Sequence, residues 1–180
     1  MSTLLKVTIS GPPGSGTSTL VAKIAESRGW RSMNGGDLFR EEARSRGLSV
    51  EELSSEAKED TNVDRHLDDL LQKRMSSLES PEIVESRLSG WWAHKNDLEC
   101  VRVWVSVSDE ERARRIQKRE GGEFSDCLQR SQKRQEDDMD RYSSLYGIDL
   151  DDMSPYHLVI DADSKDEFEV FNEVDAILGR

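Results

Sequence analysis

The sequence predicts an α/β domain in which a parallel sheet of five strands carries helices on both faces, and three observations favour this class. Short apolar runs alternate with longer segments of helical periodicity, which is the order of elements found in parallel sheets. A glycine-rich turn, residues 11–16, separates the first apolar run from the first helical segment. Charged residues directly follow several apolar runs, as they do where a ligand binds at the carboxyl edge of such a sheet.

The first half of the chain contains signals for two strands and four helices. The expected elements are a strand over 4–10, a helix over 17–27, a strand over 30–34, a helix over 37–46, a short helix after Ser49 and a longer helix after Asn62. Gly29 and Gly47 end two of these helices, because glycine readily adopts the left-handed conformation that follows a helix. Ser49 and Glu52 have the spacing of a capping box, and Gly35-Gly36 predicts a turn.

The second half predicts three strands and three helices. The expected elements are a strand at 83–85, a strand over 101–107, a basic helix from Ser108 through Arg119, a helix from Ser125 or Asp126 to Tyr146, a strand over 157–161 and a last helix capped by Ser164 and Glu167. In the strand over 101–107, valines recur at every second position and Trp104 lies on the other face. The last helix is expected to bury an apolar face made of Phe168, Phe171, Val174 and Ile177.

The turn after the first strand has the composition of a phosphate-binding loop. Glycines let the backbone pass close to an anion, and the amino end of the following helix adds a partial positive charge. The candidate nucleotide-binding residues are Gly11, Pro12, Pro13, Gly14, Ser15, Gly16, Thr17, Ser18 and Thr19. The hydroxyl of Ser18 is a candidate ligand for Mg²⁺. Thr17 stands where such loops carry a lysine, so another cation is needed near the phosphates. The competing interpretation is a turn that only links strand and helix.

Two further segments place charged side chains at the same edge of the predicted sheet. Asp37 and Arg40 lie three residues apart on one helix face, where the guanidinium could bind a phosphate group or form an ordinary surface ion pair. Glu85 and Arg87 follow a short apolar strand, and Arg87 could hold a substrate phosphate or base. We interpret Trp92, a few residues later, as core packing.

Seven arginines gather in residues 112–141 of a chain that is otherwise acidic. Their positions are 112, 114, 115, 119, 130, 134 and 141. Arg119 ends one helical pattern, while Arg134 and Arg141 lie two turns apart on the next, with Asp138 between them. The Gly121-Gly122 pair separates the two groups and could hinge a lid, so that the arginines close over a transferring phosphoryl group. The alternative is a solvated basic helix paired with nearby acids.

Composition limits the classes of function. A net charge of −12 over 180 residues argues against general binding of nucleic acid or membrane surfaces, which favours basic faces. Cys100 and Cys127 are isolated in the sequence, which predicts a reducing, cytoplasmic compartment. No linker or repeat divides the chain, so we expect one domain over 1–180, acting as a monomer on small molecules.

Taken together, these stretches resemble the archaeal-type cytidylate kinases, a branch of the nucleoside monophosphate kinases with the P-loop kinase fold. The matching motifs are Ile9-Ser10-Gly11-Pro12-Pro13-Gly14-Ser15-Gly16-Thr17, Gly36-Asp37-Leu38-Phe39-Arg40, Glu85-Ser86-Arg87-Leu88-Ser89-Gly90-Trp91, Arg115-Ile116-Gln117-Lys118-Arg119-Glu120, Arg141-Tyr142, Tyr146-Gly147-Ile148-Asp149 and Tyr156-His157-Leu158-Val159-Ile160-Asp161. The first motif is common to many kinases, whereas the combination is far more specific. Members of this branch carry threonine at the lysine position, so the resemblance implies that Thr17 is a family trait.

The resemblance implies transfer of the γ-phosphoryl group of ATP to CMP or dCMP, with Mg²⁺. It also implies roles for particular residues. The phosphate loop with Ser18 would bind ATP and metal; Asp37, Arg40 and Arg87 would line the CMP side; and Arg119, Arg134 and Arg141 would clamp the phosphates. Monophosphate-binding helices would occupy about 36–79, and a short arginine-rich lid about 119–134.

Two other hypotheses stay open at this stage. The first is an adenylate kinase, or another small-molecule kinase of the same fold. The second is a nucleotide-binding module without catalytic activity, which the missing lysine makes plausible. A panel of monophosphate acceptors separates the first from a cytidylate kinase, and ATP binding without turnover would favour the second.

Overall fold

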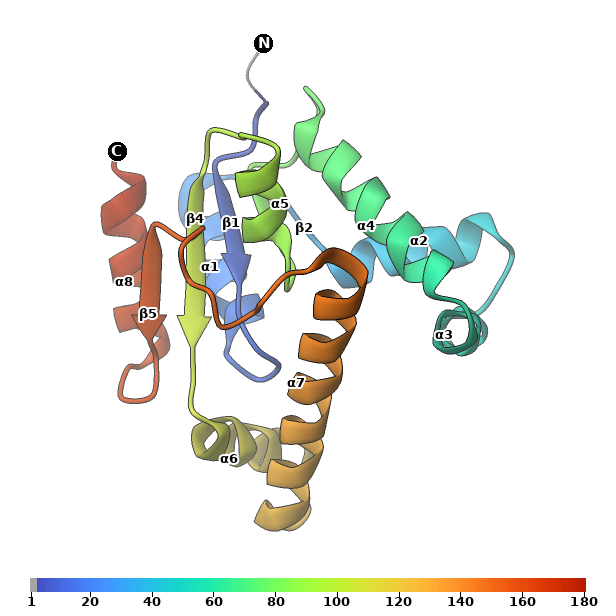
Figure 1. Ribbon diagram of the computed structural model, residues 1–180. Coiled ribbons are helices and arrows are strands. Elements are labelled where there is room, and N and C mark those ends of the chain that lie inside the picture. The colour runs from blue at the N-terminus through green and yellow to red at the C-terminus, as the bar shows by residue number, and fades with distance from the viewer. Residues whose placement is uncertain (1–2) are drawn as a thin grey trace.

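Five parallel strands form the centre of the computed structural model, which describes residues 3–180 (Figure 1). Their order is β2-β3-β1-β4-β5. The strands are β1 (Val7–Ser10), β2 (Ser32–Asn34), β3 (Ile83–Glu85), β4 (Val101–Ser106) and β5 (Leu158–Asp161). The predicted class is therefore confirmed. Ile9 is in register with both Glu85 and Val103, so the carboxyl ends of the three central strands meet at one edge of the sheet.

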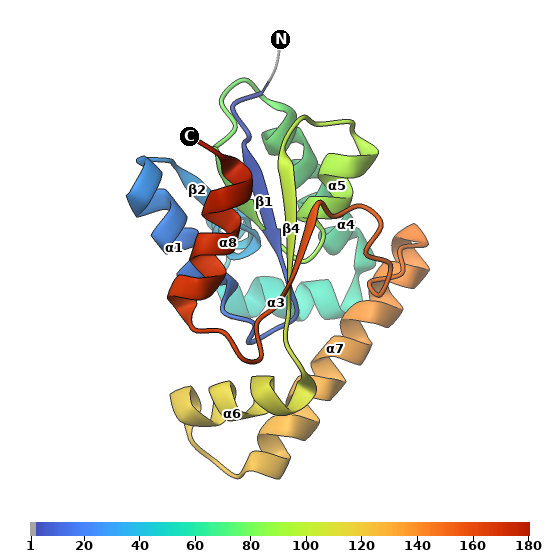
Figure 2. The ribbon, with the colours of Figure 1, turned by 90° about the vertical axis from the view of Figure 1, so that its left-hand side faces the viewer.

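Eight helices are present among residues 3–180. They are α1 (Thr17–Arg28), α2 (Gly35–Ser45), α3 (Val50–Glu59), α4 (Thr61–Ser76), α5 (Ser89–Lys95), α6 (Asp109–Glu120), α7 (Phe124–Tyr146) and α8 (Glu167–Leu178). Figure 2 shows α1 and α8 on one face of the sheet, with α4, α5 and α7 on the other. None of the helices in this described part is long and apolar enough to cross a membrane.

Each face of the sheet has its own apolar core. Successive side chains of β4 point to opposite faces, so this strand contributes to both cores. Val103 and Val105 are buried in the cluster that includes Ile24 of α1 and Val174 of α8. Trp104 points to the opposite face, where its ring centroid lies 5.4 Å from that of Tyr156. The period-two pattern predicted from the sequence is thus the pattern of burial in the structure.

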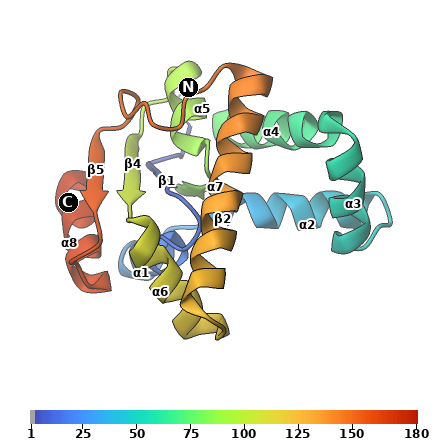
Figure 3. The same ribbon diagram turned by 60° about the horizontal axis from the view of Figure 1, so that its bottom comes forward.

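Two substructures extend from the sheet on its ligand-binding side. Helices α2, α3 and α4 form an arm (residues 35–76) with its own small cluster of Ala43, Leu53 and Val63 (Figure 3). Helices α6 and α7 pack against each other as a hairpin (residues 109–146), joined through Gly121 and Gly122. The break predicted at this glycine pair is confirmed. Arm and hairpin therefore flank the carboxyl ends of the strands.

Several helix starts differ from the prediction, because neighbouring polar residues compete to cap the same helix. Gly35-Gly36 is not a turn: the two residues form the first turn of α2, with Asn34 as the cap. Asp60, rather than Asn62, caps α4. Helix α7 begins at Phe124, and the short helix α5 had no sequence signal strong enough to predict it.

The last helix differs both in its cap and in its buried face. Asp166 accepts hydrogen bonds from the backbone N–H groups of Phe168 and Glu169, so it replaces Ser164 as the cap. The sheet contacts Val170 and Val174, whereas Phe168 is 60% exposed. The ring of Phe168 instead lies near the ammonium group of Lys23, 4.1 Å from its centroid. Val174 alone of the four predicted positions is fully buried.

Candidate active site

The glycine-rich loop between β1 and α1 is shaped by close backbone contacts. Gly14 and Gly16 have φ values of 79° and 83°, which side-chain-bearing residues rarely adopt. A Cβ atom on Gly11 would lie 2.7 Å from the carbonyl oxygen of Val105, so the loop passes too close to β4 for any side chain at that position. The sequence prediction of a tight, glycine-dependent turn at the strand end agrees with this geometry.

The loop leaves polar groups available for an anion. Helix α1 has no side-chain cap at its amino end, so the N–H groups of its first turn have no such partner. Ser15 is 3% exposed, and within residues 3–180 its hydroxyl has no hydrogen-bond partner. Uncapped N–H groups and a helix amino end are the features that bind phosphate. The loop can therefore accept the phosphates of a nucleotide.

Glu85 is the hydrogen-bond partner of Thr17, which stands where phosphate loops usually carry a lysine. The hydroxyl of Thr17 donates a 2.6 Å hydrogen bond to Oε1 of Glu85, and the hydroxyl of Ser18 lies 3.5 Å from the same oxygen. Strand β3 is the neighbour of β1, so Glu85 ends its strand beside the loop. Sequence reasoning placed Glu85 at the sheet edge but missed this role. The signal was an acidic residue ending a strand, which becomes specific only once the strand order is known.

The oxygen atoms of Ser18 and Glu85 suit a magnesium ion. Mg²⁺ prefers oxygen ligands and retains several waters, so one or two protein oxygens together with substrate phosphates are sufficient. Among the described residues, no group of three or more His, Cys, Asp or Glu side chains could hold a metal by itself. The donor set thus fits Mg²⁺ that arrives with a nucleotide, and it does not fit a closed structural metal site.

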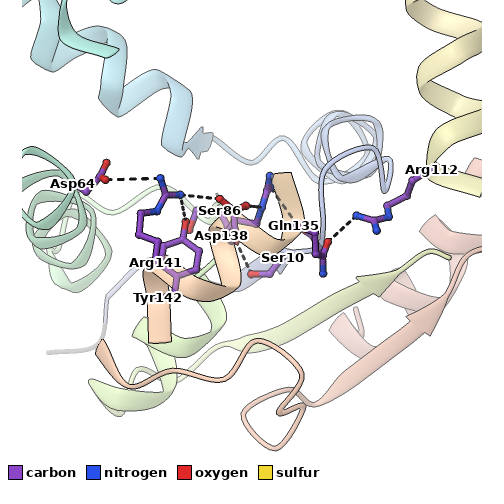
Figure 4. A network of polar contacts seen from close by, with 10 residues as sticks. Ser10, Asp64, Ser86, Arg112, Gln135, Asp138, Arg141 and Tyr142 are labelled. Carbon is purple, nitrogen blue, oxygen red and sulfur yellow. Dashed lines mark hydrogen bonds and ion pairs between the residues drawn. The ribbon is translucent and has the colours of Figure 1, made fainter. Parts of the chain in front are cut away.

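Arg87 and Arg141 converge on one carboxylate, that of Asp138. Nε of Arg87 donates to Oδ2 of Asp138 at 2.8 Å, and Nη2 of Arg141 donates to Oδ1 at 2.8 Å (Figure 4). Nη1 of Arg87 also reaches the carbonyl oxygen of Gly11 at 3.4 Å. The turn that carries Arg87 is fixed by Ser10, whose hydroxyl donates to the carbonyl of Ser86 at 2.7 Å. Two of the predicted site arginines are therefore brought together beside the loop.

Arg141 is also tied to the arm. Its Nη1 atom lies 3.8 Å from Oδ2 of Asp64 on α4, and Nη2 contacts the hydroxyl of Tyr142 at 3.2 Å. Burial lowers the pKa of Arg141, but the neighbouring Tyr142, Asp138 and Asp64 outweigh burial and raise that pKa. The guanidinium therefore stays charged in its partly buried position.

A second contact between α7 and the arm contains a perturbed carboxyl group. The hydroxyl of Tyr146 donates a short hydrogen bond to Asp68 on α4. Burial raises the pKa of Asp68 to about 6, although the hydrogen bond from Tyr146 opposes that rise. Burial and the contact with Asp68 also raise the pKa of Tyr146. The ring of Tyr146 packs edge-on against Trp92, which is 4% exposed, as the interpretation of Trp92 as core packing requires.

Arg115 ties the hairpin to the phosphate loop and Arg112 ties α6 to α7, contacts that the sequence did not single out. Arg112 is 2% exposed; it pairs with Asp109, and its Nη1 donates to Oε1 of Gln135 at 2.7 Å (Figure 4). Arg115 donates to the carbonyl oxygen of Ser15 at 3.3 Å. These arginines hold α6, α7 and the loop together.

Arg119 and Arg134 point to solvent in this structure. Arg119 is paired with its neighbour Glu120, and its side chain is 65% exposed. Arg134 is exposed and, in the part of the chain that the structure describes, forms no ion pair. Within residues 3–180, neither side chain shares a hydrogen-bond partner with Arg87 or Arg141. Their role in binding phosphates therefore stays a prediction.

Asp37 and Arg40 form the exposed ion pair that was the alternative interpretation, with 2.7 Å between Nη2 and Oδ1. Asp37 is also occupied in the cap of α2, where its Oδ2 accepts from the backbone N–H of Asn34 at 3.0 Å. The two side chains line a cavity of about 680 Å³ with Met33 of β2. This arrangement does not bring them into contact with Arg87 in the described chain.

Comparison with known proteins gives the family. A family profile described as an AAA domain matches residues 10–140. The cytidylate kinase of Archaeoglobus fulgidus is 41% identical over 162 residues, which cover 90% of this chain and 88% of that protein. The cytidylate kinase of Haloquadratum walsbyi is 42% identical, covering 84% of this chain and 78% of that protein.

Solved structures extend the comparison to the fold. Shikimate kinase from Bacteroides thetaiotaomicron superposes with a TM-score of 0.64 at 13% identity, covering 97% of this chain and 98% of that one. This likeness concerns the arrangement of helices and strands alone. Its agreement with the parallel sheet and the phosphate loop, together with relatives above 40% identity over most of the sequence, gives one conclusion: the chain belongs to the cytidylate kinase family.

Proposed function

We propose that this protein transfers the γ-phosphoryl group of ATP to CMP or dCMP, giving ADP and CDP or dCDP. The observation that carries this proposal is the likeness to cytidylate kinases along nearly the whole chain. The loop supports it, because its uncapped helix end and constrained glycines suit a triphosphate. The paired Arg87 and Arg141 beside Gly11 support it as well, because two guanidiniums next to a phosphate loop suit a second phosphate group.

The loop and its neighbours would hold the donor nucleotide. Residues 11–19 would surround the phosphates with backbone N–H groups, and Arg115, which bonds to the carbonyl oxygen of Ser15, would help to hold the loop in place. Ser18, with Glu85, would hold Mg²⁺, which when bound offsets negative charge on the β- and γ-phosphates. Thr17 donates its hydroxyl to Glu85 and so orients this carboxylate beside Ser18.

The acceptor and the clamp involve the remaining arginines. Arg87, with Asp37 and Arg40, would line the CMP side. The monophosphate-binding helices, about 36–79, would close over it. Arg119, Arg134 and Arg141 would neutralise charge on the transferring phosphoryl group once the lid, about 119–134, has closed. The exposure of Arg119 and Arg134 agrees with an open lid. Phosphoryl transfer requires mainly positioning and charge stabilisation, which such residues provide.

A coupled assay with ATP, Mg²⁺ and a panel of acceptors tests the proposal. We expect turnover with CMP and dCMP that exceeds turnover with AMP, UMP or shikimate by orders of magnitude, and loss of turnover when Mg²⁺ is chelated. Faster phosphorylation of AMP, UMP or shikimate would assign the protein to another small-molecule kinase. ATP binding in calorimetry without turnover on any acceptor would identify a binding module.

We also propose a cytoplasmic monomer without nucleic-acid or membrane partners. The acidic net charge of −12 supports the absence of such partners. Both cysteines are free thiols in the described chain, and burial raises the pKa of Cys100 to about 11, so its reactive thiolate form is scarce. Light scattering on the purified protein checks the monomer directly.

A further inference from the structure

Asp138 differs from the other acidic residues of the hairpin. It is 8% exposed, and it is the one carboxylate among the buried residues of 3–180. Both of its oxygens accept a 2.8 Å hydrogen bond from a guanidinium, one from Arg87 and one from Arg141. Its neighbour Asp137 shows the contrast, because that side chain is 60% exposed and pairs with Lys133 at the surface.

The two arginines come from different parts of the chain and carry like charges. Arg87 follows β3 and lies 51 residues from Asp138, whereas Arg141 lies one helical turn further along α7. Without an anion between them, two partly buried guanidiniums would repel each other and lose their common orientation. A carboxylate that bonds to both offsets this repulsion and fixes each fork by a charge-assisted hydrogen bond.

The arrangement leaves donors on both arginines. A guanidinium has five N–H groups, and Asp138 uses one nitrogen of each. Nη1 of Arg87 lies 3.4 Å from the carbonyl oxygen of Gly11, next to the phosphate loop. Nε of Arg141 is buried and has no hydrogen-bond partner among the described residues. The three side chains together carry a net charge of about +1, so they can still attract a phosphate dianion.

We propose that Asp138 is a positioning residue for the acceptor: it holds Arg87 and Arg141 together so that their remaining N–H groups meet the phosphate of the bound monophosphate. The proposal rests on the proposed function, which places Arg87 on the acceptor side, and adds that Arg141 of the clamp also donates to the acceptor phosphate. Asp138 acts through them and does not take part in the chemical step. Its effect therefore belongs in the binding of the acceptor and much less in the binding of ATP.

Asp138→Asn tests this role, because it removes the charge and retains the shape. We expect the KM for CMP to rise about tenfold or more, as charge-assisted hydrogen bonds to two arginines are weakened, while the KM for ATP stays within about twofold. Asp137→Asn is the matched control: it makes the same change one residue away at the surface and should leave both KM values unchanged. A D138N enzyme with the wild-type KM for CMP overturns the proposal.

A double-mutant cycle with Arg141→Lys separates positioning from general stabilisation of the fold. If Asp138 works through Arg141, D138N raises the KM for CMP much less in the R141K background than in the wild type. The proposal is contradicted if the two substitutions raise the KM for CMP by factors that simply multiply in the double variant, while both lower the melting temperature. If D138N does not fold, Asp138→Glu retains the charge but displaces it, and an unchanged KM for CMP in that variant is equally contradictory. Absence of CMP turnover by the wild type would instead reject the proposed function.

Discussion

At position 17 a hydroxyl replaces the cation that most phosphate loops carry, and the structure adds an acid beside it. The hydroxyl of Thr17 donates to Glu85 of β3 at 2.6 Å, so a negative side chain lies beside the loop where a lysine would place a positive one. Bound phosphates then need positive charge from elsewhere. On the proposed function, the arginines of the hairpin supply it.

Substitutions at the residue level test this source of charge. We expect Arg119→Ala and Arg134→Ala each to lower kcat by about 10³–10⁵, the range known for arginines that stabilise phosphoryl-transfer transition states. Thr17→Lys should be tolerated, because the ammonium group gains Glu85 as a partner. Steady-state kinetics with CMP measure all three. Full activity of both alanine variants would contradict the clamp.

The residues of the loop were predictable from the sequence, but their partners were not. Residues 11–18 adjoin one another in the chain, so glycine spacing alone reports their conformation. Glu85 and Thr17 are 68 residues apart, and Asp138 and Arg87 are 51 apart. Such pairs depend on strand order and on the path of α7, which local propensity does not encode. The sequence showed Asp138 only as a neighbour of Arg134 and Arg141. Its burial against Arg87 and Arg141, from which we propose its positioning role, is visible only in the structure.

At the level of elements, the strands and most helix ends followed from local signals. Gly29 and Gly147 end α1 and α7 in the left-handed conformation, as expected. Helix starts were less certain, because Asp60 and Asp166 compete with Asn62 and Ser164 for the same cap. The short helix α5 is stabilised by its place between β1, β4 and α4, which is a tertiary effect.

Close packing of α5 gives a prediction about stability. A Cβ atom on Gly90 would lie 2.4 Å from Cε1 of Tyr156, a buried ring that packs against Trp104. Gly90→Ala should therefore destabilise the protein by about 1–3 kcal/mol through overpacking. Urea denaturation measures the change in the free energy of unfolding.

Gly35→Ala is the matched control for this substitution. Gly35 also lies in the first turn of a helix, and the new Cβ would lie at an ordinary distance of 3.8 Å from Ser86. The control should leave stability unchanged or raise it slightly, since alanine lowers the entropy of the unfolded chain. Equal effects of the two substitutions would show that the contact with Tyr156 is not what excludes a side chain at Gly90.

On the scale of the whole molecule, α7 joins parts that are far apart in the sequence. Its Gln135 contacts Arg112 of α6, as Figure 4 shows. Its Asp138 contacts Arg87 after β3, and its Tyr146 contacts Asp68 on the arm. The organisation as one domain over 1–180, expected from the uninterrupted sequence, stays a prediction. Boundaries for the lid and for the acceptor-binding helices stay predictions, because they concern movement.

The buried position of Asp68 between α4 and α7 makes stability depend on pH. Burial raises the pKa of Asp68 from 3.8 to about 6, so the folded state binds its proton more tightly than the unfolded state does. This contribution to stability is complete below about pH 4 and is lost as the pH rises to about 6 and beyond. Asp68→Asn retains an acceptor for Tyr146 and does not titrate.

The melting temperature of D68N minus that of the wild type should therefore increase between about pH 4.5 and pH 7. Differential scanning calorimetry at several pH values measures this difference. A constant difference for D68N would show that the Asp68 carboxyl titrates alike in the folded and unfolded states.

The three contacts of α7 also have a thermodynamic consequence for the two nucleotides. A displacement of this one helix would move α6, whose Arg115 bonds to the phosphate loop, and at the same time Arg87, which we propose lines the acceptor side. The two binding equilibria are then linked, and linkage is reciprocal: whatever factor the first ligand imposes on the affinity for the second is returned in equal measure. Whichever substrate arrives first therefore changes the affinity for the second by the same factor as in the reverse order.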